Sequence, residues 1–165
     1  MKQPSPTPSP SPADQQRLAL LIEAESLQLG EFLALLDREE SLLIKGETDA
    51  LVAVANQKNE RYRELQRLHD ERSRLLGRLG YSVSDASIRS LCAGLPRVLA
   101  RWDEVVSRAR QARDRNALNG QLILERMAGN QAALTVLLSA ANHPQLYDAD
   151  GLAKPTGGGR ILGSA

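Results

Sequence analysis

The chain is poor in the residues that define several common classes of protein. Only 3% of its 165 residues are aromatic, which argues against a β-sandwich, because strands favour aromatic and β-branched side chains. It contains a single cysteine, Cys92, so an intrachain disulfide is impossible and an oxidising compartment is not implied. The neighbours Leu91 and Ala93 supply neither a base nor a cation. We therefore expect Cys92 to be an inert packing residue.

An excess of one charge and long apolar runs are absent as well. Lys and Arg number 21 against 20 Asp and Glu, so the basic character of a nucleic-acid-binding protein is missing. No stretch approaches the ~18 apolar residues of a transmembrane helix, and the N-terminus lacks the apolar core of a secretory signal. These features predict a soluble, cytoplasmic protein that does not bind nucleic acid.

Patterns that indicate catalysis or metal binding do not appear. His69 and His143 are far apart, and neither has a cysteine or another histidine at metal-ligand spacing. Residues 157–159 are three glycines that follow no strand and open no helix, so they do not resemble a phosphate-binding loop. The arginine-rich residues 108–115 also include Asp114 and are expected to form a solvated helix face. The sequence predicts no cofactor, no metal and no catalytic residue, and thus a protein that is not an enzyme.

Helix-forming residues are abundant, and they predict an all-α fold. Leu, Ala, Arg, Glu and Gln dominate the sequence. Residues 1–12 alternate Pro with Ser or Thr, which favours a disordered leader that acts as a spacer over a PxxP ligand. Residues 13–142 are expected to form a helical bundle, and residues 143–165 a flexible C-terminal tail. The expected architecture is an antiparallel bundle of three long helices, with a coiled-coil-like hairpin followed by a long third helix.

The first two helices of this bundle are indicated by apolar residues at alternating steps of three and four. The first is expected to run from a cap at Asp14 to Lys45, where the following glycine ends it. The second is expected to begin after a cap at Thr48 or Asp49 and to stop near Gly80.

An antiparallel hairpin aligns these two helices when the numbers of facing residues add up to 97. This register pairs the apolar positions with one another, and it also places Glu39 opposite Lys58 and Glu25 opposite Arg72. Neither acid has a histidine or a second carboxylate one turn away, which disfavours metal binding. We expect both ion pairs to fix the register of the hairpin.

A short helical segment is expected between a cap at Ser84 and Cys92, and the longest helix is expected to start at Pro96. Trp102 is the expected apolar anchor at one end of the bundle, and Asn116 and Asn119 are expected to form a polar layer. The other expected positions of the apolar stripe are Leu99, Val106, Ala109, Ile123, Met127, Asn130, Leu134, Leu137 and Ala141.

The third helix is too long for the hairpin to cover it completely. At 1.5 Å per residue, it would measure roughly 69 Å to Ala141, against roughly 48 Å for the helix that ends at Lys45. The excess begins near Gly129, where a glycine favours a bend. This excess is too apolar to stand alone in water, so it is expected to fold back on the bundle, to dimerise or to bind a partner. Exposed apolar surface of this extent usually marks an interaction site. The candidate binding residues are Ala133, Leu134, Val136, Leu137, Leu138 and Ala141.

Three segments in the C-terminal third of the chain form a recognisable series: NALNGQLI at residues 116–123, GNQAALTVL at residues 129–137 and LYDADG at residues 146–151. In this order they resemble the FlgN family, cytoplasmic export chaperones of the bacterial flagellum. Trp102 precedes the Asn-rich stretch in the family's order, and the N-terminal helices match in pattern, with Glu39, Lys58 and Arg61 in fitting positions. The Pro/Ser leader lies outside the family's pattern.

The resemblance implies a chaperone that binds the terminal helices of flagellar hook-associated proteins and prevents their premature assembly. It also implies delivery of these clients to the cytoplasmic domain of the flagellar type III export gate, so that the protein meets the membrane only indirectly. Client binding would belong to residues 129–141 and gate docking to Tyr147. The residues themselves leave open a structural coiled-coil protein that homodimerises through its C-terminal helix.

Overall fold

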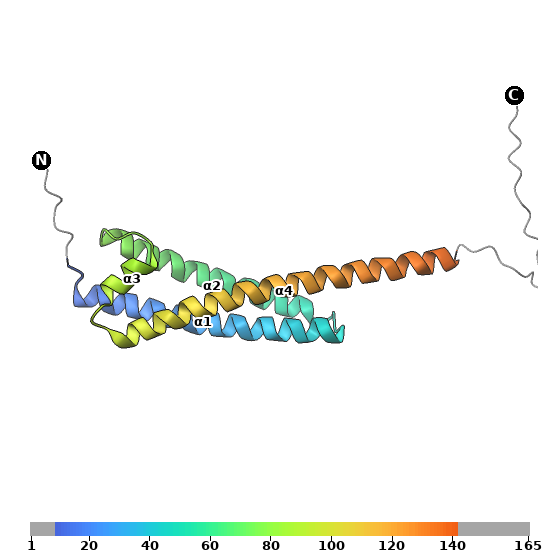
Figure 1. Cartoon of the computed structure of the whole chain (residues 1–165), viewed down its shortest axis with the longest axis horizontal. Helices are drawn as coiled ribbons and strands as arrows, with labels where there is room; N and C mark the ends of the chain where they lie inside the picture. The colour runs from blue at the N-terminus through green and yellow to red at the C-terminus, as the bar shows by residue number, and fades with distance from the viewer. Residues whose placement is uncertain (1–8, 142–165) are drawn as a thin grey trace, which may run out of the picture. The chain divides into compact units, whose positions relative to one another are not determined.

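The computed structural model describes residues 9–141, with side chains described up to residue 136. Over these residues the chain is all-helical, as its composition predicts, with four helices and no strand. They are α1 (Pro12–Lys45), α2 (Leu51–Arg78), α3 (Asp85–Leu91) and α4 (Pro96–Ala141), shown in Figure 1. None of the helices in this part of the chain is both long and apolar enough to cross a membrane. The predicted tail and the first eight residues of the predicted leader lie outside the described residues.

The start of α1 differs from the prediction because its cap is Ser11, not Asp14. The Oγ atom of Ser11 accepts a hydrogen bond from the backbone N of Asp14 at 3.1 Å, and the backbone N of Ser11 donates to Oδ2 of Asp14 at 3.3 Å. This reciprocal capping box satisfies two N–H groups at the helix start. Pro12 fits the first turn because it has no N–H that needs a partner. The assignment of residue 12 to a non-helical leader was therefore wrong.

The remaining helix ends follow the sequence with one exception. Gly46 adopts a left-handed conformation with φ 74° and ends α1 as predicted. Ser84 caps α3, and its Oγ atom accepts from the backbone N of Ser87 at 3.2 Å. The exception is α2, where Ala50 occupies the cap position without a side-chain hydrogen bond. The predicted caps of α2, Thr48 and Asp49, were wrong.

Helices α1 and α2 lie side by side and antiparallel (Figure 1). Nε of Arg72 donates to Oε1 of Glu25 at 3.0 Å, and Nζ of Lys58 donates to Oε1 of Glu39 at 3.0 Å. The residue numbers of both pairs add up to 97, the register that the sequence predicts. Both predicted charge pairs are thus confirmed.

Helix α4 runs parallel to α1 over its first half. The contacts between them join residues whose numbers differ by a nearly constant amount, from 78 for Ser26 and Glu104 to 83 for Leu36 and Asn119. A constant difference, in contrast to a constant sum, is the signature of parallel helices. Short helix α3 makes this arrangement possible because it links the end of α2 to the start of α4.

The main apolar core lies where α3 meets the first half of α1, the second half of α2 and the start of α4. Trp102 is 6% exposed in this core, which confirms its predicted role as an anchor. The other buried members of the core are Leu18, Leu21, Ile22, Leu29, Leu68, Leu75, Leu76, Ile88, Leu91, Cys92 and Val105.

The buried stripe of α4 is rotated from the predicted one. Val105, Ala112 and Asn119 are buried at intervals of seven residues, whereas Ala109 and Asn116 are exposed. Asn119 contacts Leu36 of α1, whereas Asn116 contacts Lys58 of α2. Apolar residues occur at both sets of positions, so their spacing could not decide which helix α4 packs against more closely.

Candidate partner-binding surface

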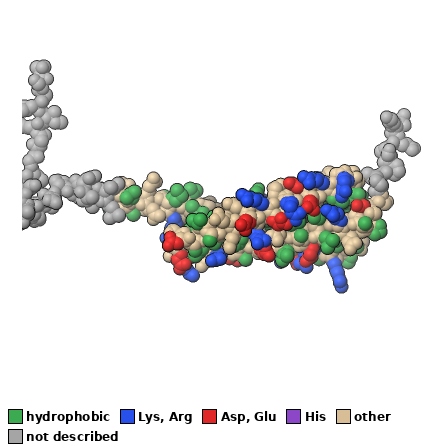
Figure 2. Space-filling view, turned by 180° about the vertical axis from the view of Figure 1, so that it is seen from behind, with side chains coloured by type: hydrophobic (Ala, Val, Ile, Leu, Met, Phe, Trp, Pro, Cys, Tyr) green, Lys and Arg blue, Asp and Glu red, His purple; other side chains and the backbone are tan. Residues whose placement is uncertain are grey.

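The C-terminal part of α4 exposes large apolar side chains. Leu124 is 67% exposed, Met127 62% and Leu134 54%. The helix is continuous from Pro96 to Ala141, so the bend that the sequence favours at Gly129 does not interrupt it. In Figure 2, charged and hydrophobic side chains are both present on the visible face. Such exposed apolar surface is typical of an interaction site.

Three of these side chains share one face of α4. Ile123, Met127 and Leu134 follow one another at steps of four and seven, which bring side chains back to the same side of a helix. We call this set the α4 stripe. These three positions belong to the stripe that the sequence predicts, and they lie within about 40° of buried Val105 around the helix. The apolar pattern is therefore covered at Val105 and exposed at Met127 and Leu134.

The predicted binding residues divide into those the structure describes and those it does not. Ala133, Leu134 and Val136 are exposed on α4, as a binding surface requires. Val136 lies two residues after Leu134 and therefore on nearly the opposite side of the helix. The predicted set thus spans more than one face, and Ile123 and Met127 belong with Leu134 instead. The side chains of Leu137, Leu138 and Ala141, and all of Tyr147, lie outside the described residues.

A polar layer contains Asn119, the last fully buried residue of α4 among those whose side chains are described. The Nδ2 group of Asn119 donates to the carbonyl oxygen of Leu36 at 2.9 Å and to Oε1 of Glu39 at 3.0 Å. Nζ of Lys58 donates to Oδ1 of Asn116 at 2.8 Å and also to Glu39. This layer joins α1, α2 and α4, which supports the predicted polar role of both asparagines. A buried layer of this kind fixes the rotation of a helix because its hydrogen bonds tolerate little movement.

The second charge pair is more deeply embedded. Burial raises the pKa of Glu25, and the adjacent Arg72 opposes that shift. Arg72 also lies over the ring of Trp102, 4.9 Å from the ring centroid, and one of its guanidinium nitrogens is 3.1 Å from Nδ1 of His69. The pair therefore joins α1, α2 and α4 through one guanidinium group.

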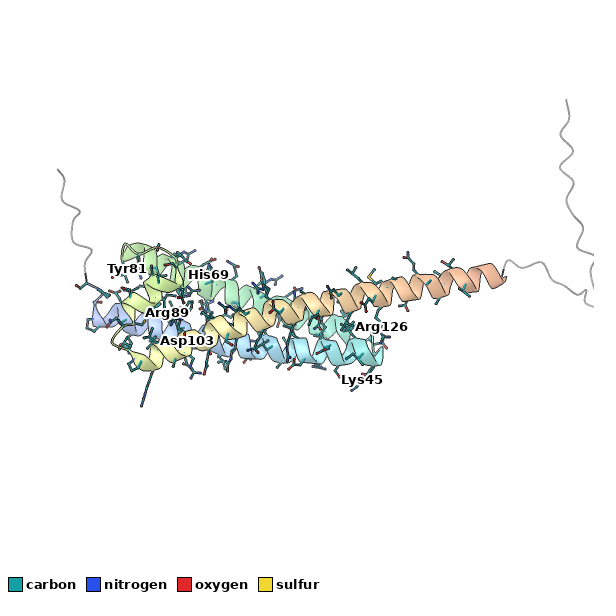
Figure 3. All side chains as sticks on the ribbon, in the orientation of Figure 1. Lys45, His69, Tyr81, Arg89, Asp103 and Arg126 are labelled. Carbon is teal, nitrogen blue, oxygen red and sulfur yellow. The ribbon has the colours of Figure 1, made fainter. Side chains whose placement is uncertain are left out.

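Charged contacts also fasten the start of α4 to α3. The Nε1 group of Trp102 donates to Oδ1 of Asp85 at 2.7 Å. Hydrogen bonds from Arg89 and then from Trp102 lower the pKa of Asp85. Arg89 and Asp103 lie next to each other in Figure 3 and form an ion pair at 2.7 Å. These contacts fix where α4 begins.

The sequence predicted that the arginine-rich residues 108–115 of α4 form a solvated face, but two of these arginines contact α1. Arg108 donates to the carbonyl oxygen of Ser26 at 2.7 Å, and Arg115 forms an ion pair with Asp37 of α1. Arg113, which pairs with its exposed neighbour Asp114, fits the prediction better. The prediction missed the contacts of Arg108 and Arg115 because their partners are far away in the sequence and come close only when the helices pack.

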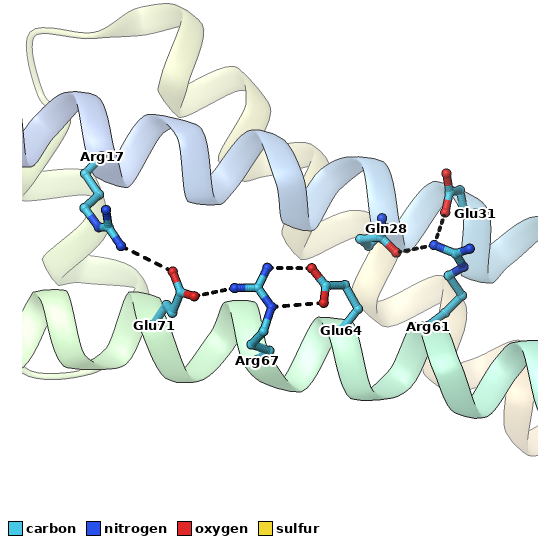
Figure 4. Close-up of polar contacts among 7 residues, drawn as sticks. All are labelled: Arg17, Gln28, Glu31, Arg61, Glu64, Arg67 and Glu71. Carbon is cyan, nitrogen blue, oxygen red and sulfur yellow. Dashed lines mark hydrogen bonds and ion pairs between the residues drawn. The ribbon is translucent and has the colours of Figure 1, made fainter.

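A row of polar contacts joins α1 and α2 on their surface (Figure 4). Arg61 forms an ion pair with Glu31 at 2.9 Å and donates to Oε1 of Gln28 at 3.1 Å. Further along α2, Arg67 lies between Glu64 and Glu71. Exposed pairs such as these contribute roughly 0–1 kcal/mol each, so they assist the register that the buried pairs set.

Candidates for chemistry are few in this part of the chain. Cys92 is buried, and desolvation raises the pKa of its thiol, which disfavours the reactive thiolate. Among the described residues, no group of three or more His, Cys, Asp and Glu side chains could hold a metal ion. His143 lies outside these residues.

The chain is similar to a known protein family. The family model of the FlgN protein matches residues 14–155. The chain belongs to the FlgN family. FlgN proteins are flagellar export chaperones, and the match extends from the start of α1 past the end of α4. No curated protein and no solved structure matches the chain.

Proposed function

We propose that this FlgN protein is a cytoplasmic chaperone that binds flagellar hook-associated proteins and delivers them to the type III export gate. Membership of an export chaperone family supports this assignment. The observation that carries it is the exposed α4 stripe, which offers a client large apolar side chains on one side of a helix. By covering terminal helices of the client, the chaperone prevents their premature assembly.

An amphipathic client helix fits this surface. A helix in a groove or on another helix binds through apolar anchors at i, i+3, i+4 and i+7. The steps of four and seven residues in the α4 stripe fit this periodicity, and Leu134, Leu137, Leu138 and Ala141 have this spacing in full. Burying an exposed leucine or methionine contributes ~1.5–3 kcal/mol. Met127 and Leu134 are therefore expected to be anchors, and Leu137, Leu138 and Ala141 extend the same helix toward its end.

Substitutions on opposite sides of α4 test the assignment. We expect Leu134→Asp to weaken binding of a hook-associated protein at least about tenfold, because it loses apolar burial and places a carboxylate in the interface. The matched control is Val136→Asp, which adds the same charge two residues away on the other side and should change affinity less than about threefold. Calorimetric titration of each full-length variant measures both. Equal effects of the two substitutions would contradict a single docking face.

The tail is proposed to contact the export gate through Tyr147. We expect Tyr147→Ala to weaken binding to the cytoplasmic domain of the gate and to leave client affinity unchanged, because the α4 stripe remains intact. Binding of each partner is measured separately with the same protein. An unchanged affinity for the gate would remove Tyr147 from this role.

The second candidate function is a structural coiled-coil protein that forms a homodimer through α4. In this dimer the α4 stripes of two copies would pack against each other. Analytical ultracentrifugation at low protein concentration, with and without client, measures the mass of the complex and so distinguishes the chaperone from the homodimer. A chaperone is expected to form a complex of chaperone and client. A dimer that persists and never exchanges for client would favour the structural coiled-coil protein.

A further inference from the structure

The outer face of α1 carries apolar side chains that remain exposed. Leu20 is 64% exposed and Leu27 is 61% exposed, although the same helix supplies much of the buried core. Both leucines lie at least about 100° around the helix from Glu25, which contacts α2, and from Ser26, which contacts α4. An exposed alanine follows seven residues to either side and extends this face over about six turns. We call this set the α1 line: Ala13, Leu20, Leu27 and Ala34.

The α1 line is complementary to itself in an antiparallel arrangement. The numbers of Leu20 and Leu27 add up to 47, and so do those of Ala13 and Ala34. When two copies of α1 lie antiparallel with facing residues that add up to 47, each leucine of the line packs against a leucine and each alanine against an alanine. Such a pair has a two-fold axis, and both copies use the same surface, as is usual in homodimers.

Charged side chains beside the line favour the antiparallel arrangement over a parallel one. Arg17 and Glu31 lie on the same edge of the line, and their numbers add up to 48. An antiparallel second copy therefore brings its Glu31 close to Arg17. Parallel copies keep these two residues roughly 21 Å apart along the helix.

The two charged side chains are available to a second copy. Arg17 is 61% exposed, and its contact with Glu71 of α2 is 3.5 Å long. Glu31 is 45% exposed and lies 2.9 Å from Arg61 of α2 (Figure 4). A guanidinium group has five N–H donors, and a carboxylate accepts several hydrogen bonds, so each group has capacity for a further partner.

The residues next to the two-fold axis permit close approach of the two helices. Ala24 has a small side chain, and Glu23 forms an ion pair with Arg101 at 2.7 Å. Neither a bulky group nor an uncompensated charge therefore keeps the copies apart. We infer that the α1 line is the interface of an antiparallel homodimer.

This dimer is expected to be weak and independent of client binding. Its apolar contact is one helix wide, which is typical of small, transient interfaces, and a dissociation constant of roughly 1–100 μM is expected. The dimer buries a face of α1 and not the α4 stripe. It therefore differs from a coiled-coil dimer through α4, and it does not compete with a client for that stripe.

Self-association of the full-length protein tests the interface. Leu27→Glu places a carboxylate against Leu20 of the second copy and should weaken the dimer at least about tenfold in sedimentation equilibrium, with client affinity within about twofold of wild type. The matched control is Leu118→Glu at a leucine that is 58% exposed on α4, which should leave the dimer within about twofold of wild type. A wild-type protein that stays monomeric at about 200 μM, or equal weakening by both substitutions, would overturn the α1 interface. Loss of client binding by Leu27→Glu with unchanged self-association would also overturn it, because the client would then occupy the line.

Disulfide crosslinking tests the register. Cys92 is buried, so cysteines introduced into the exposed line can be followed separately. In the antiparallel dimer, residue 13 of one copy faces residue 34 of the other. A mixture of Ala13→Cys and Ala34→Cys is therefore expected to form a crosslinked dimer when an oxidant is added, whereas each variant alone should form little. Crosslinking of each variant with itself would show parallel copies and overturn the antiparallel interface, and the proposed function would remain intact.

Discussion

The two halves of α4 carry the same apolar pattern, and only one of them is buried. Trp102, Val105 and Ala112 are 5–6% exposed, whereas Met127 and Leu134 on the same face are 62% and 54% exposed. The difference does not come from α4 itself. The offset of 78 to 83 residues between α1 and α4 brings Lys45, the last residue of α1, level with the region of Leu124. Helix length in the hairpin therefore decides which apolar residues form the core and which remain available to a partner.

The largest expected effect separates the halves by stability. Trp102→Ala should lower the free energy of unfolding by roughly 3–5 kcal/mol, because it empties a buried site and removes the hydrogen bond to Asp85. Met127→Ala, the matched change in the exposed half, should alter it by less than about 0.5 kcal/mol. Urea denaturation of both variants provides the measurement. A large loss for Met127→Ala would show that the exposed half is part of the core.

A smaller effect is expected at the boundary between the halves. Asn119→Ala removes two buried hydrogen bonds, to Leu36 and Glu39, and should cost about 1–3 kcal/mol of unfolding free energy. Asn130→Ala, at an exposed position of the same helix, should be nearly neutral. The same denaturation experiment compares them. Similar values for the two asparagines would mean that the polar layer does not secure α4.

The buried polar contacts show how far the sequence could predict the packing of α1, α2 and α4. The register of α1 and α2 followed from the sequence, because both Glu39 with Lys58 and Glu25 with Arg72 fit one sum. The rotation of α4 about its axis did not follow from the sequence. Asn116 and Asn119 were equally plausible as inward-facing residues, and only the packing of α4 on α1 buries Asn119. Local patterns define each helix, but the choice of neighbour depends on contacts between distant segments.

The candidate site was predictable to a similar extent. An apolar excess at the end of α4 follows from helix lengths, and Leu134 is exposed there as expected. The contact of Lys58 with Asn116 could not be predicted, because it depends on how α2 and α4 pack. Capping at α1 was missed for a local reason: Ser11 and Asp14 are both good caps, and Pro12 settles the choice by fitting the first turn.

The smallest expected effect concerns the exposed half alone. A Cβ atom added at Gly129 would meet no atom within 4 Å, whereas one added at Gly30 of α1 would lie 3.3 Å from a guanidinium nitrogen of Arg108. Gly129→Ala should therefore stabilise the helix locally by up to about 1 kcal/mol, and Gly30→Ala should gain less because Arg108 must move. Hydrogen exchange of the neighbouring amides measures the local effect.

The effect of Gly129→Ala on the affinity for the client is more informative than its effect on stability. If the α4 stripe binds as a straight helix, a more ordered helix should bind up to about fivefold more tightly, because less ordering remains to be done on binding. Titration with a hook-associated protein measures the change, with Gly77→Ala, another open position but on α2, as the control. Weaker binding by Gly129→Ala alone would mean that the client requires α4 to bend at this glycine. In that case the continuous helix is the unbound form of the surface, and the two halves of α4 differ in flexibility as well as in burial.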